Sequence, residues 1–108
     1  MKNNKFNSTV PKIIKDRRWN EIAYLQADSN YTNVIFANGQ KEVSGYHLKF
    51  FSQILDTAIF LRIDRSNLVH RSFIAEVIHL NSEVHVLLKD QKEIKIPRRK
   101  IPFLKSIL

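Results

Sequence analysis

The sequence predicts a mainly β domain, with small antiparallel β-sheets packed together with one amphipathic α-helix and a short C-terminal helix. Apolar and polar residues alternate along most of the segment from 21 to 96, which is the period of half-buried strands. Turn-forming pairs such as Asn38-Gly39 separate the alternating runs. Within that segment, only residues 44–55 space their apolar side chains as a helix does.

Two antiparallel groups of strands are expected. The first starts with EIAYLQ (21–26) and NVIFA (33–37), and Asn38-Gly39 before QKEVS is the strongest hairpin signal in the chain. The second group is a meander with turns at Asn81-Ser82 and Asp90-Gln91. Its strands are expected in AEVIHL, EVHVLLK and KEIKI, at 75–80, 83–89 and 92–96.

Two helices complete the expected fold. The apolar residues of SGYHLKFFSQIL predict about three turns from near Tyr46 to Asp56, with Ser44 as the N-cap. At the C-terminus, the apolar residues from Ile101 to Leu108 predict a short helix with Pro102 in its first turn. No second amphipathic helix follows the first closely, so a helix-turn-helix is not supported.

The charge of the chain indicates a polyanionic partner. Eighteen Lys and Arg against ten Asp and Glu give a net charge of +8 in 108 residues. The cations concentrate near the two ends of the chain, while the middle is nearly balanced. We expect a basic N-terminal segment, 1–20, followed by one folded domain, 21–108, that is large enough for a single core.

Several classes of protein are disfavoured. The chain has no cysteine, no signal peptide and no apolar run of the roughly 18 residues that span a membrane, so a cytoplasmic protein is expected. It has no Gly-rich phosphate loop and no recognised nucleophile motif, so neither catalysis nor a cofactor is expected. His79 and His85 flank a hairpin turn without a third ligand, so no metal site is expected.

Three polar clusters lie at predicted strand ends, at 28–33, 62–67 and 97–100. Folding that brings them onto one edge would offer cations and small hydrogen-bonding groups to the phosphates and base edges of a double helix. The second cluster interrupts FLRIDRSNLVH (60–70), whose predicted core anchors are Phe60, Ile63, Leu68 and Val69. This segment is therefore expected to hold a polar turn at the surface.

The order ADSNYTNV, NGQ, HLKFFSQIL, FLRIDRSNLVHRSFI, EVHVLL and IPRRK resembles the LytTR family of bacterial DNA-binding domains. The family pattern reads approximately E-A-x-G-N-Y-x-x-V, a hairpin, S-L-K-x-L-x-x-x-L, F-x-R-[IV]-H-R-S-x-[LV]-V-N-x-x-x-I and V-S-R-R. The match keeps its order and spacing from about Ile22 to Leu104. The residues that carry it are Asn30-Tyr31, Leu48-Lys49, Phe60, Arg62, Arg65-Ser66, Leu68-Val69, Ile74 and Arg98-Arg99.

The resemblance implies sequence-specific binding of double-stranded DNA by a bacterial transcription regulator, with loops entering successive grooves. By position, Thr32 would enter one major groove, Arg99 the next, and Arg65 the minor groove between them. Arg99 can bind guanine through two hydrogen bonds, whereas Arg65 would respond to DNA shape. Candidate phosphate contacts, which set register without reading sequence, are Asn30, Asn33, Lys49, Ser66, Arg98 and Lys100.

Family members are typically output domains of two-component response regulators and bind paired sites. The resemblance therefore implies a second copy on tandem DNA sites, and a receiver domain or sensor on another chain as a further partner. No βα receiver pattern is present in these 108 residues. No membrane partner is expected.

Three residues depart from the family pattern, Asp64 for histidine, His70 for asparagine and Pro97 for serine. Asp64 places a negative charge beside Arg65, and we expect it to weaken a phosphate contact there. Arg62 is ambiguous, because alternation would also let it turn inward toward an acid such as Asp64 or Glu76.

Other readings of the residues stay open. Tyr31 and Tyr46 are expected to pack in the core or at a sheet edge rather than to stack on bases. A small basic RNA-binding or ribosome-associated β domain would have the same charge and strand content, although its sheet usually exposes aromatic residues. A protein-interaction module that has lost DNA binding is a third possibility, for which Asp64 and Pro97 are the hints.

Overall fold

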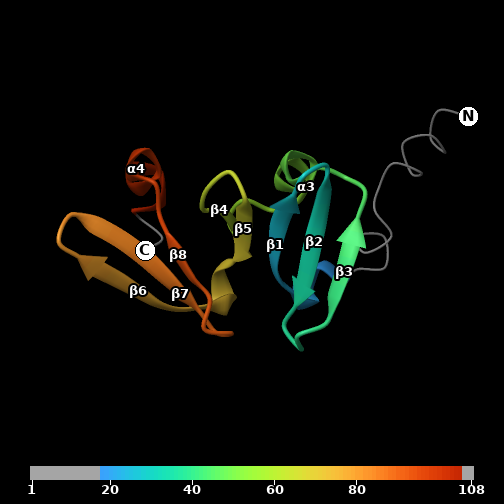
Figure 1. The fold of residues 1–108 in the computed structure, drawn as a ribbon, viewed down its shortest axis with the longest axis horizontal. Coiled ribbons are helices and arrows are strands. Elements are labelled where there is room, and N and C mark those ends of the chain that lie inside the picture. Colours follow the sequence, from blue (N-terminus) through green and yellow to red (C-terminus); the bar gives the residue numbers. More distant parts are fainter. Residues whose placement is uncertain (1–17, 106–108) are drawn as a thin grey trace, which may run out of the picture.

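The structure is a computed structural model that describes residues 18–105 (Figure 1). Along the chain its elements are η1 (Arg18–Glu21), β1 (Ile22–Asp28), β2 (Tyr31–Phe36), β3 (Lys41–Ser44), α3 (Leu48–Ile54), β4 (Phe60–Arg62), β5 (Asn67–His70), η2 (Arg71–Phe73), β6 (Ile74–Leu80), β7 (Glu83–Leu88), β8 (Glu93–Lys95), η3 (Arg98–Lys100) and α4 (Ile101–Leu104). No helix in the described part of the chain is long and apolar enough to cross a membrane.

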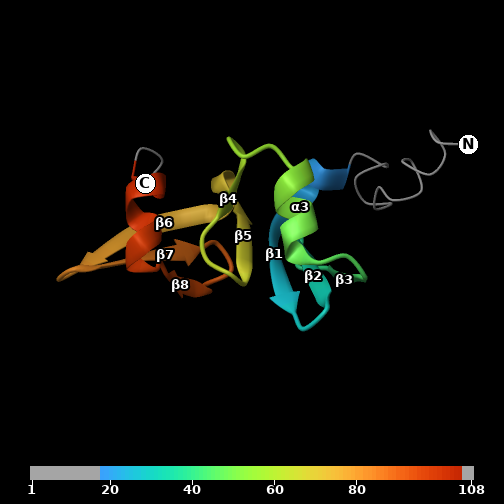
Figure 2. The ribbon, with the colours of Figure 1, turned by 90° about the horizontal axis from the view of Figure 1, so that it is seen from above.

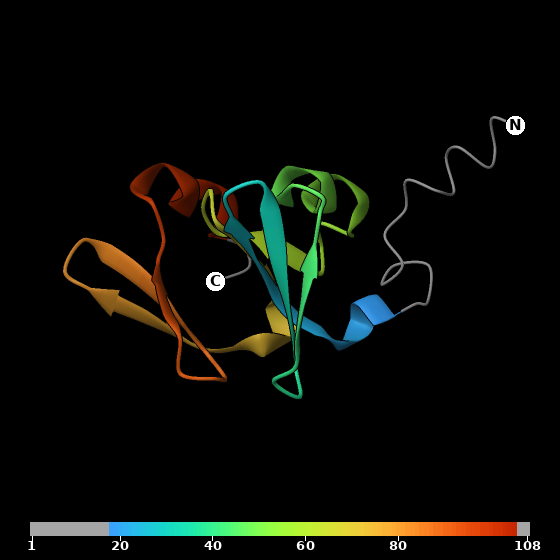
Figure 3. The same ribbon diagram turned by 45° about the vertical axis from the view of Figure 1, so that its right-hand side comes forward.

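The strands form two antiparallel sheets, as expected from the sequence. The larger sheet has the order β3-β2-β1-β5-β4, and the smaller has the order β6-β7-β8. Helix α3 packs on one face of the larger sheet, and the smaller sheet and α4 pack on its other face. Figure 3 shows the β6–β7 hairpin projecting away from the larger sheet. The mainly β fold with two short α-helices is therefore confirmed.

Residues with left-handed backbone make the turns between paired strands. Gly39, with a φ of 93°, lies in the turn between β2 and β3, which confirms the hairpin predicted from Asn38-Gly39. Asn81 (φ 58°) and Gln91 (φ 78°) lie in the two turns of the β6-β7-β8 meander. Both groups of strands thus form where the turn residues predict them.

Two hydrophobic cores lie on the two faces of the larger sheet, so the expectation of a single core is wrong. The segment 60–70 anchors both of them. Phe60 and Leu68 pack with α3, while Ile63 and Val69 pack against the smaller sheet. All four side chains are at most 2% exposed, as predicted. Burial of such side chains stabilises a fold by about 1.5–3 kcal/mol each. The polar residues between them are therefore held at a fixed place on the surface.

The helices differ in detail from the prediction. Helix α3 is shorter than expected, and Ser44 is not its N-cap, because Ser44 ends β3 and its hydroxyl accepts the Tyr46 N–H within the connecting loop (3.3 Å). The N-cap is His47, without a side-chain hydrogen bond. Pro102 lies in the first turn of α4, as predicted. Leu108, part of the predicted C-terminal helix, lies outside the described residues.

A hydrogen bond ties the larger sheet to the meander. The Tyr24 hydroxyl on β1 donates to Asp90 Oδ2 at 2.9 Å, and Asp90 Oδ1 accepts the Lys92 N–H at 3.1 Å within the β7–β8 turn. Burial first, and then the hydrogen bond and charge of Asp90, raise the pKa of Tyr24 to about 12. The folded state therefore favours the protonated phenol.

We predict that Tyr24→Phe lowers the free energy of unfolding by about 1–2 kcal/mol at neutral pH, because Asp90 loses a buried donor. The raised pKa makes this contribution fully present below pH 10 and lost as the pH rises toward 12. Urea unfolding at pH 8 and pH 11 measures the difference, with the exposed Tyr31→Phe as the control. If Tyr24→Phe lowered the free energy of unfolding by the same amount at both pH values, the proposed role of this hydroxyl would be contradicted.

Candidate nucleic-acid interface

The three polar clusters meet along one edge of the molecule. The β1–β2 turn, the β4–β5 connection and the start of α4 all lie at the upper edge in Figure 1, next to α3. Seen from above in Figure 2, α4, the β4–β5 connection and α3 follow one another in a row. This edge therefore combines two connections of the larger sheet with the segment that follows the smaller sheet.

A hollow of about 430 Å³ lies between the β4–β5 connection and the segment around η3. Four cationic side chains and one carboxylate line it, so its field favours a negatively charged ligand. We call it the basic groove and define it by its lining residues, Arg62, Asp64, Arg65, Ser66, Pro97, Arg99 and Lys100. Both of its walls are thus segments that the sequence predicted to contact DNA.

The carboxylate of Asp64 is used inside its own turn. Asp64 Oδ1 accepts hydrogen bonds from the Ser66 N–H (2.8 Å) and from Asn67 Nδ2 (3.0 Å). Such an Asx turn fixes the backbone two residues further on. The acid that departs from the family pattern therefore shapes the turn that carries Arg65 and Ser66.

The guanidinium of Arg62 is half-buried and makes three hydrogen bonds. Nε donates to the Asp64 carbonyl (2.8 Å), one terminal nitrogen to the Arg65 carbonyl (2.9 Å), and the other to Ser52 Oγ (3.1 Å). Burial lowers the pKa of Arg62, and the charge of Asp64 opposes that shift. Arg62 therefore turns inward, which is one of the two predicted alternatives. Its hydrogen bonds go to carbonyl and hydroxyl oxygens rather than to an acidic side chain.

Ser52 was not among the predicted site residues. A serine in the middle of a predicted helix gives no sign that a guanidinium from a later strand will reach it. The contact depends on how α3 crosses the larger sheet, and only the folded structure shows this.

Thr32 is not available to DNA. Its side chain is 0% exposed, and its hydroxyl donates to the Tyr46 carbonyl at 2.7 Å. Alternation along β2 places Thr32 on the same face as Val34 and Phe36, which is covered by α3. The prediction that Thr32 enters a major groove is therefore wrong for this conformation of the protein.

Other residues of the first cluster are exposed instead. Asn30 lies exposed in the β1–β2 turn, and Tyr31 beside it is 56% exposed, so Tyr31 does not pack in a core. Tyr46 does pack, with its ring stacked on Phe50 at 4.7 Å between centroids. Asn33 is half-buried within β2.

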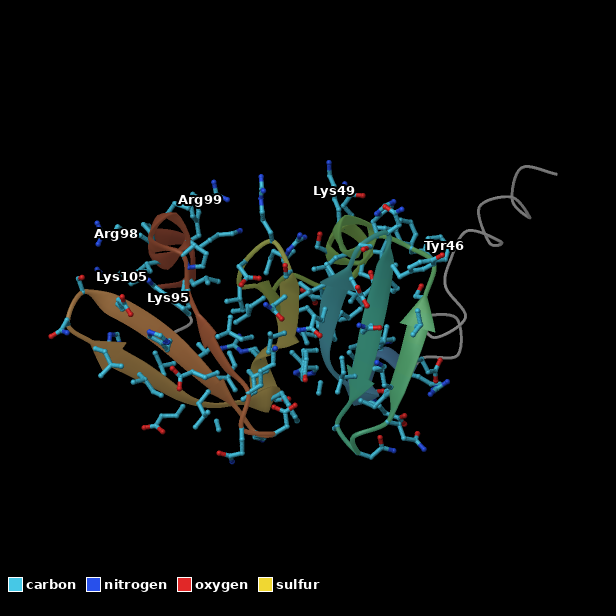
Figure 4. The ribbon with its side chains drawn as sticks, in the orientation of Figure 1. Tyr46, Lys49, Lys95, Arg98, Arg99 and Lys105 are labelled. Atoms are coloured by element: carbon cyan, nitrogen blue, oxygen red, sulfur yellow. The ribbon has the colours of Figure 1, made fainter. Side chains whose placement is uncertain are left out.

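The remaining predicted contacts divide between two sides of the molecule. In Figure 4 the side chains of Lys49 and Arg99 point upward from the edge, whereas Arg98 points to the flank, with Lys95 and Lys105. Arg98 and Lys95 line a separate hollow of about 190 Å³. Arg98 and Arg99, which are adjacent in η3, therefore lie on different surfaces of the molecule.

The histidine pair flanking the β6–β7 turn does not converge. His79 is opposite Val84 in the register and His85 is opposite Ile78, so the two rings lie on opposite faces of the hairpin. His85 instead contacts Glu83 (3.0 Å) and Glu93 (2.9 Å). Residues 18–105 contain no group of three or more His, Asp or Glu side chains arranged to hold a metal ion.

We predict that Asp64→Ala lowers the free energy of unfolding by about 1–2 kcal/mol and also lowers affinity for duplex DNA, because the Ser66 N–H and Asn67 amide lose their acceptor. The charge-matched control is Asp28→Ala, at the exposed end of β1 on the same edge. Urea unfolding and fluorescence anisotropy measure the two effects. If both variants raised DNA affinity equally, Asp64 would act only as a repulsive charge.

The sequence of the chain is similar to a described protein family and to two regulators. The family model described as the LytTr DNA-binding domain matches residues 16–108. Two heme-containing CO-sensing transcriptional regulators of Paraburkholderia xenovorans (strain LB400), RcoM 2 and RcoM 1, are 26% and 27% identical over 90 residues, or 82% of this chain. The chain spans 33% of the length of each.

A solved LytTr DNA-binding domain from Bacillus cereus has a similar fold. Its TM-score to this chain is 0.72, at 18% identity, and the match covers 82% of both chains. The family model accounts for most of the 108 residues, including both sheets and the edge that carries the basic groove. The chain therefore belongs to the LytTR family of DNA-binding domains.

Proposed function

We propose that this chain binds double-stranded DNA in a sequence-specific manner, as the DNA-binding part of a bacterial transcription regulator, and that it is not an enzyme. The observation that carries the proposal is the basic groove, which Arg65 and Ser66 of the β4–β5 connection line together with Arg99 and Lys100 of η3. Family membership supports it, and so does the printed description of both RcoM relatives as transcriptional regulators. Such a protein would act in the cytoplasm.

Three kinds of contact follow from the chemistry of the edge. Arg99 is exposed and can donate two hydrogen bonds to guanine, which is worth about 1–3 kcal/mol of discrimination. Arg65, on the opposite wall, would follow the shape and negative potential of a minor groove. The phosphate contacts we assign are Lys49, Ser66 and Lys100, with Asn30 from the β1–β2 turn.

The path of the DNA follows from these positions. A duplex along the upper edge of Figure 1 would pass the β1–β2 turn, the β4–β5 connection and η3 in succession. Asn30 and Tyr31 take the place we first expected for Thr32, because they are the exposed side chains of that turn. Arg98 would reach a phosphate from the flank, and the half-buried Asn33 is the weakest of the proposed contacts.

The partners of the whole protein belong to the same proposal. A second copy would bind a neighbouring site on the same side of the duplex. A receiver domain or a sensor on another chain would supply the regulatory signal.

The proposed function predicts steeply salt-dependent binding to a duplex recovered by selection from random DNA. Each phosphate neutralised contributes about −0.9 to the slope of log affinity against log salt. Anisotropy titrations between 50 and 300 mM salt, about the range where such contacts weaken most, measure this slope. Equal affinity for the selected duplex, a random duplex and an RNA hairpin would contradict a sequence-specific DNA regulator.

The divergent arginines of η3 offer a matched pair of variants. We predict that Arg99→Ala costs about 1–3 kcal/mol with the selected duplex and removes discrimination at one base position. We predict that Arg98→Ala weakens all sequences alike and reduces the salt slope by about one unit, because its contact would be to phosphate. Binding to duplexes substituted at each position distinguishes them, and identical profiles would refute the division of roles.

A further inference from the structure

We propose that Arg62 is a positioning residue for DNA binding, which sets the place of Arg65 and Ser66 relative to Lys49, and that it is not itself a phosphate contact. The inference rests on the proposed function, because it concerns how the basic groove is presented to DNA. It follows from the hydrogen bonds of the guanidinium, from its burial and from the two elements that it joins.

The guanidinium is already occupied. Of its five N–H donors, three bind the carbonyls of Asp64 and Arg65 and the hydroxyl of Ser52, at 2.8, 2.9 and 3.1 Å. A group that lines a groove but points its donors at the protein has few left for a ligand. Arg65, in contrast, is exposed on the same turn.

The contacts form a continuous chain between two DNA-facing segments. The Ser52 hydroxyl accepts from Arg62 and donates to the Lys49 carbonyl at 2.8 Å. Arg62 in turn holds the Arg65 carbonyl. The backbones of Lys49 and Arg65 are therefore joined through two side chains, although they belong to α3 and to the β4–β5 turn. Fixing both in one arrangement before DNA arrives lowers the entropy cost of binding.

The turn is held from both sides by opposite charges. The Arg62 guanidinium binds two carbonyls of the turn, and the Asp64 carboxylate binds the Ser66 N–H and the Asn67 side-chain amide. Lysine cannot replace Arg62 here, because a single ammonium nitrogen cannot reach three acceptors that a planar fork reaches together. This difference separates a positioning residue from a phosphate contact, for which the positive charge of lysine would suffice.

The test compares Arg62→Ala and Arg62→Lys, each in the wild-type background and in the Arg65→Ala, Ser66→Ala background. The control is Arg71→Ala, because Arg71 also donates to a backbone carbonyl, that of Ala58 at 3.2 Å, and does not line the basic groove. Affinity for the selected duplex is measured by anisotropy. Circular dichroism melts establish that each variant folds.

We expect each Arg62 variant to bind the selected duplex about tenfold more weakly than the wild type does. A loss of this size is typical of the coupling between residues in one hydrogen-bond network. In the Arg65→Ala, Ser66→Ala background we expect the further loss to fall below about twofold. Rescue by lysine, or the same loss in both backgrounds, would overturn the proposal and make Arg62 a direct phosphate contact.

A second measurement does not depend on DNA. We expect Arg62→Ala to speed hydrogen exchange at the Ser66 amide by about tenfold, while core amides such as that of Val69 keep their protection. Unchanged exchange at Ser66 would refute the positioning role. The two proposals can fail separately. If Arg62→Ala loosens the turn as expected, but neither the wild type nor any variant prefers the selected duplex over a random one, the proposed function fails while Arg62 still holds the turn.

Discussion

The structure depends on the two-sided burial of one short segment, residues 60–70. Its apolar side chains alternate between the core beneath α3 and the core beneath the smaller sheet, and each is almost fully buried. A shift of the backbone by one residue would turn each apolar side chain toward the wrong core and would bring polar neighbours such as Arg62 into apolar positions. The polar turn between the anchors is consequently fixed in place, and with it one wall of the basic groove.

The charges of the edge divide into those that build it and those that face outward. Arg62 and Asp64 are used by the protein, because their donors and acceptors end on the backbone of their own turn. Arg65, Arg99 and Lys49 are exposed, so a polyanion can use them without breaking a contact that holds the fold. Counting cations in the sequence overstates the number that are available to DNA.

The sequence predicted the fold because its signals are local. Asn38-Gly39 and Asn81-Ser82 mark turns where left-handed backbone is required, and alternation shows which residues face a core. The burial of Thr32 could have been predicted by the same alternation, because it shares a face with Val34 and Phe36. The position of Thr32 in the family pattern predicts a groove contact, whereas its place on the strand predicts burial, and the structure agrees with the strand.

The rest of the site depends on contacts between distant segments. Nothing near Ser52 or Arg62 in the chain shows that these two side chains will meet, and nothing in Arg98-Arg99 shows that adjacent arginines will line different hollows. The helix boundary at Ser44 was also wrong for this reason, since β3 pairs with β2 through that residue and keeps it extended. Such features follow from how the sheets and α3 pack.

We propose that one duplex contacts both walls of the basic groove, the β4–β5 turn and η3. Amide chemical shifts recorded by NMR during titration with the selected duplex measure this contact. Contact with both walls predicts that amides at 65–66 and at 99–100 shift together at the same stoichiometry, while those at the Asn81-Ser82 turn do not. Shifts confined to one wall of the groove, or centred on the β6–β7 hairpin, would contradict it.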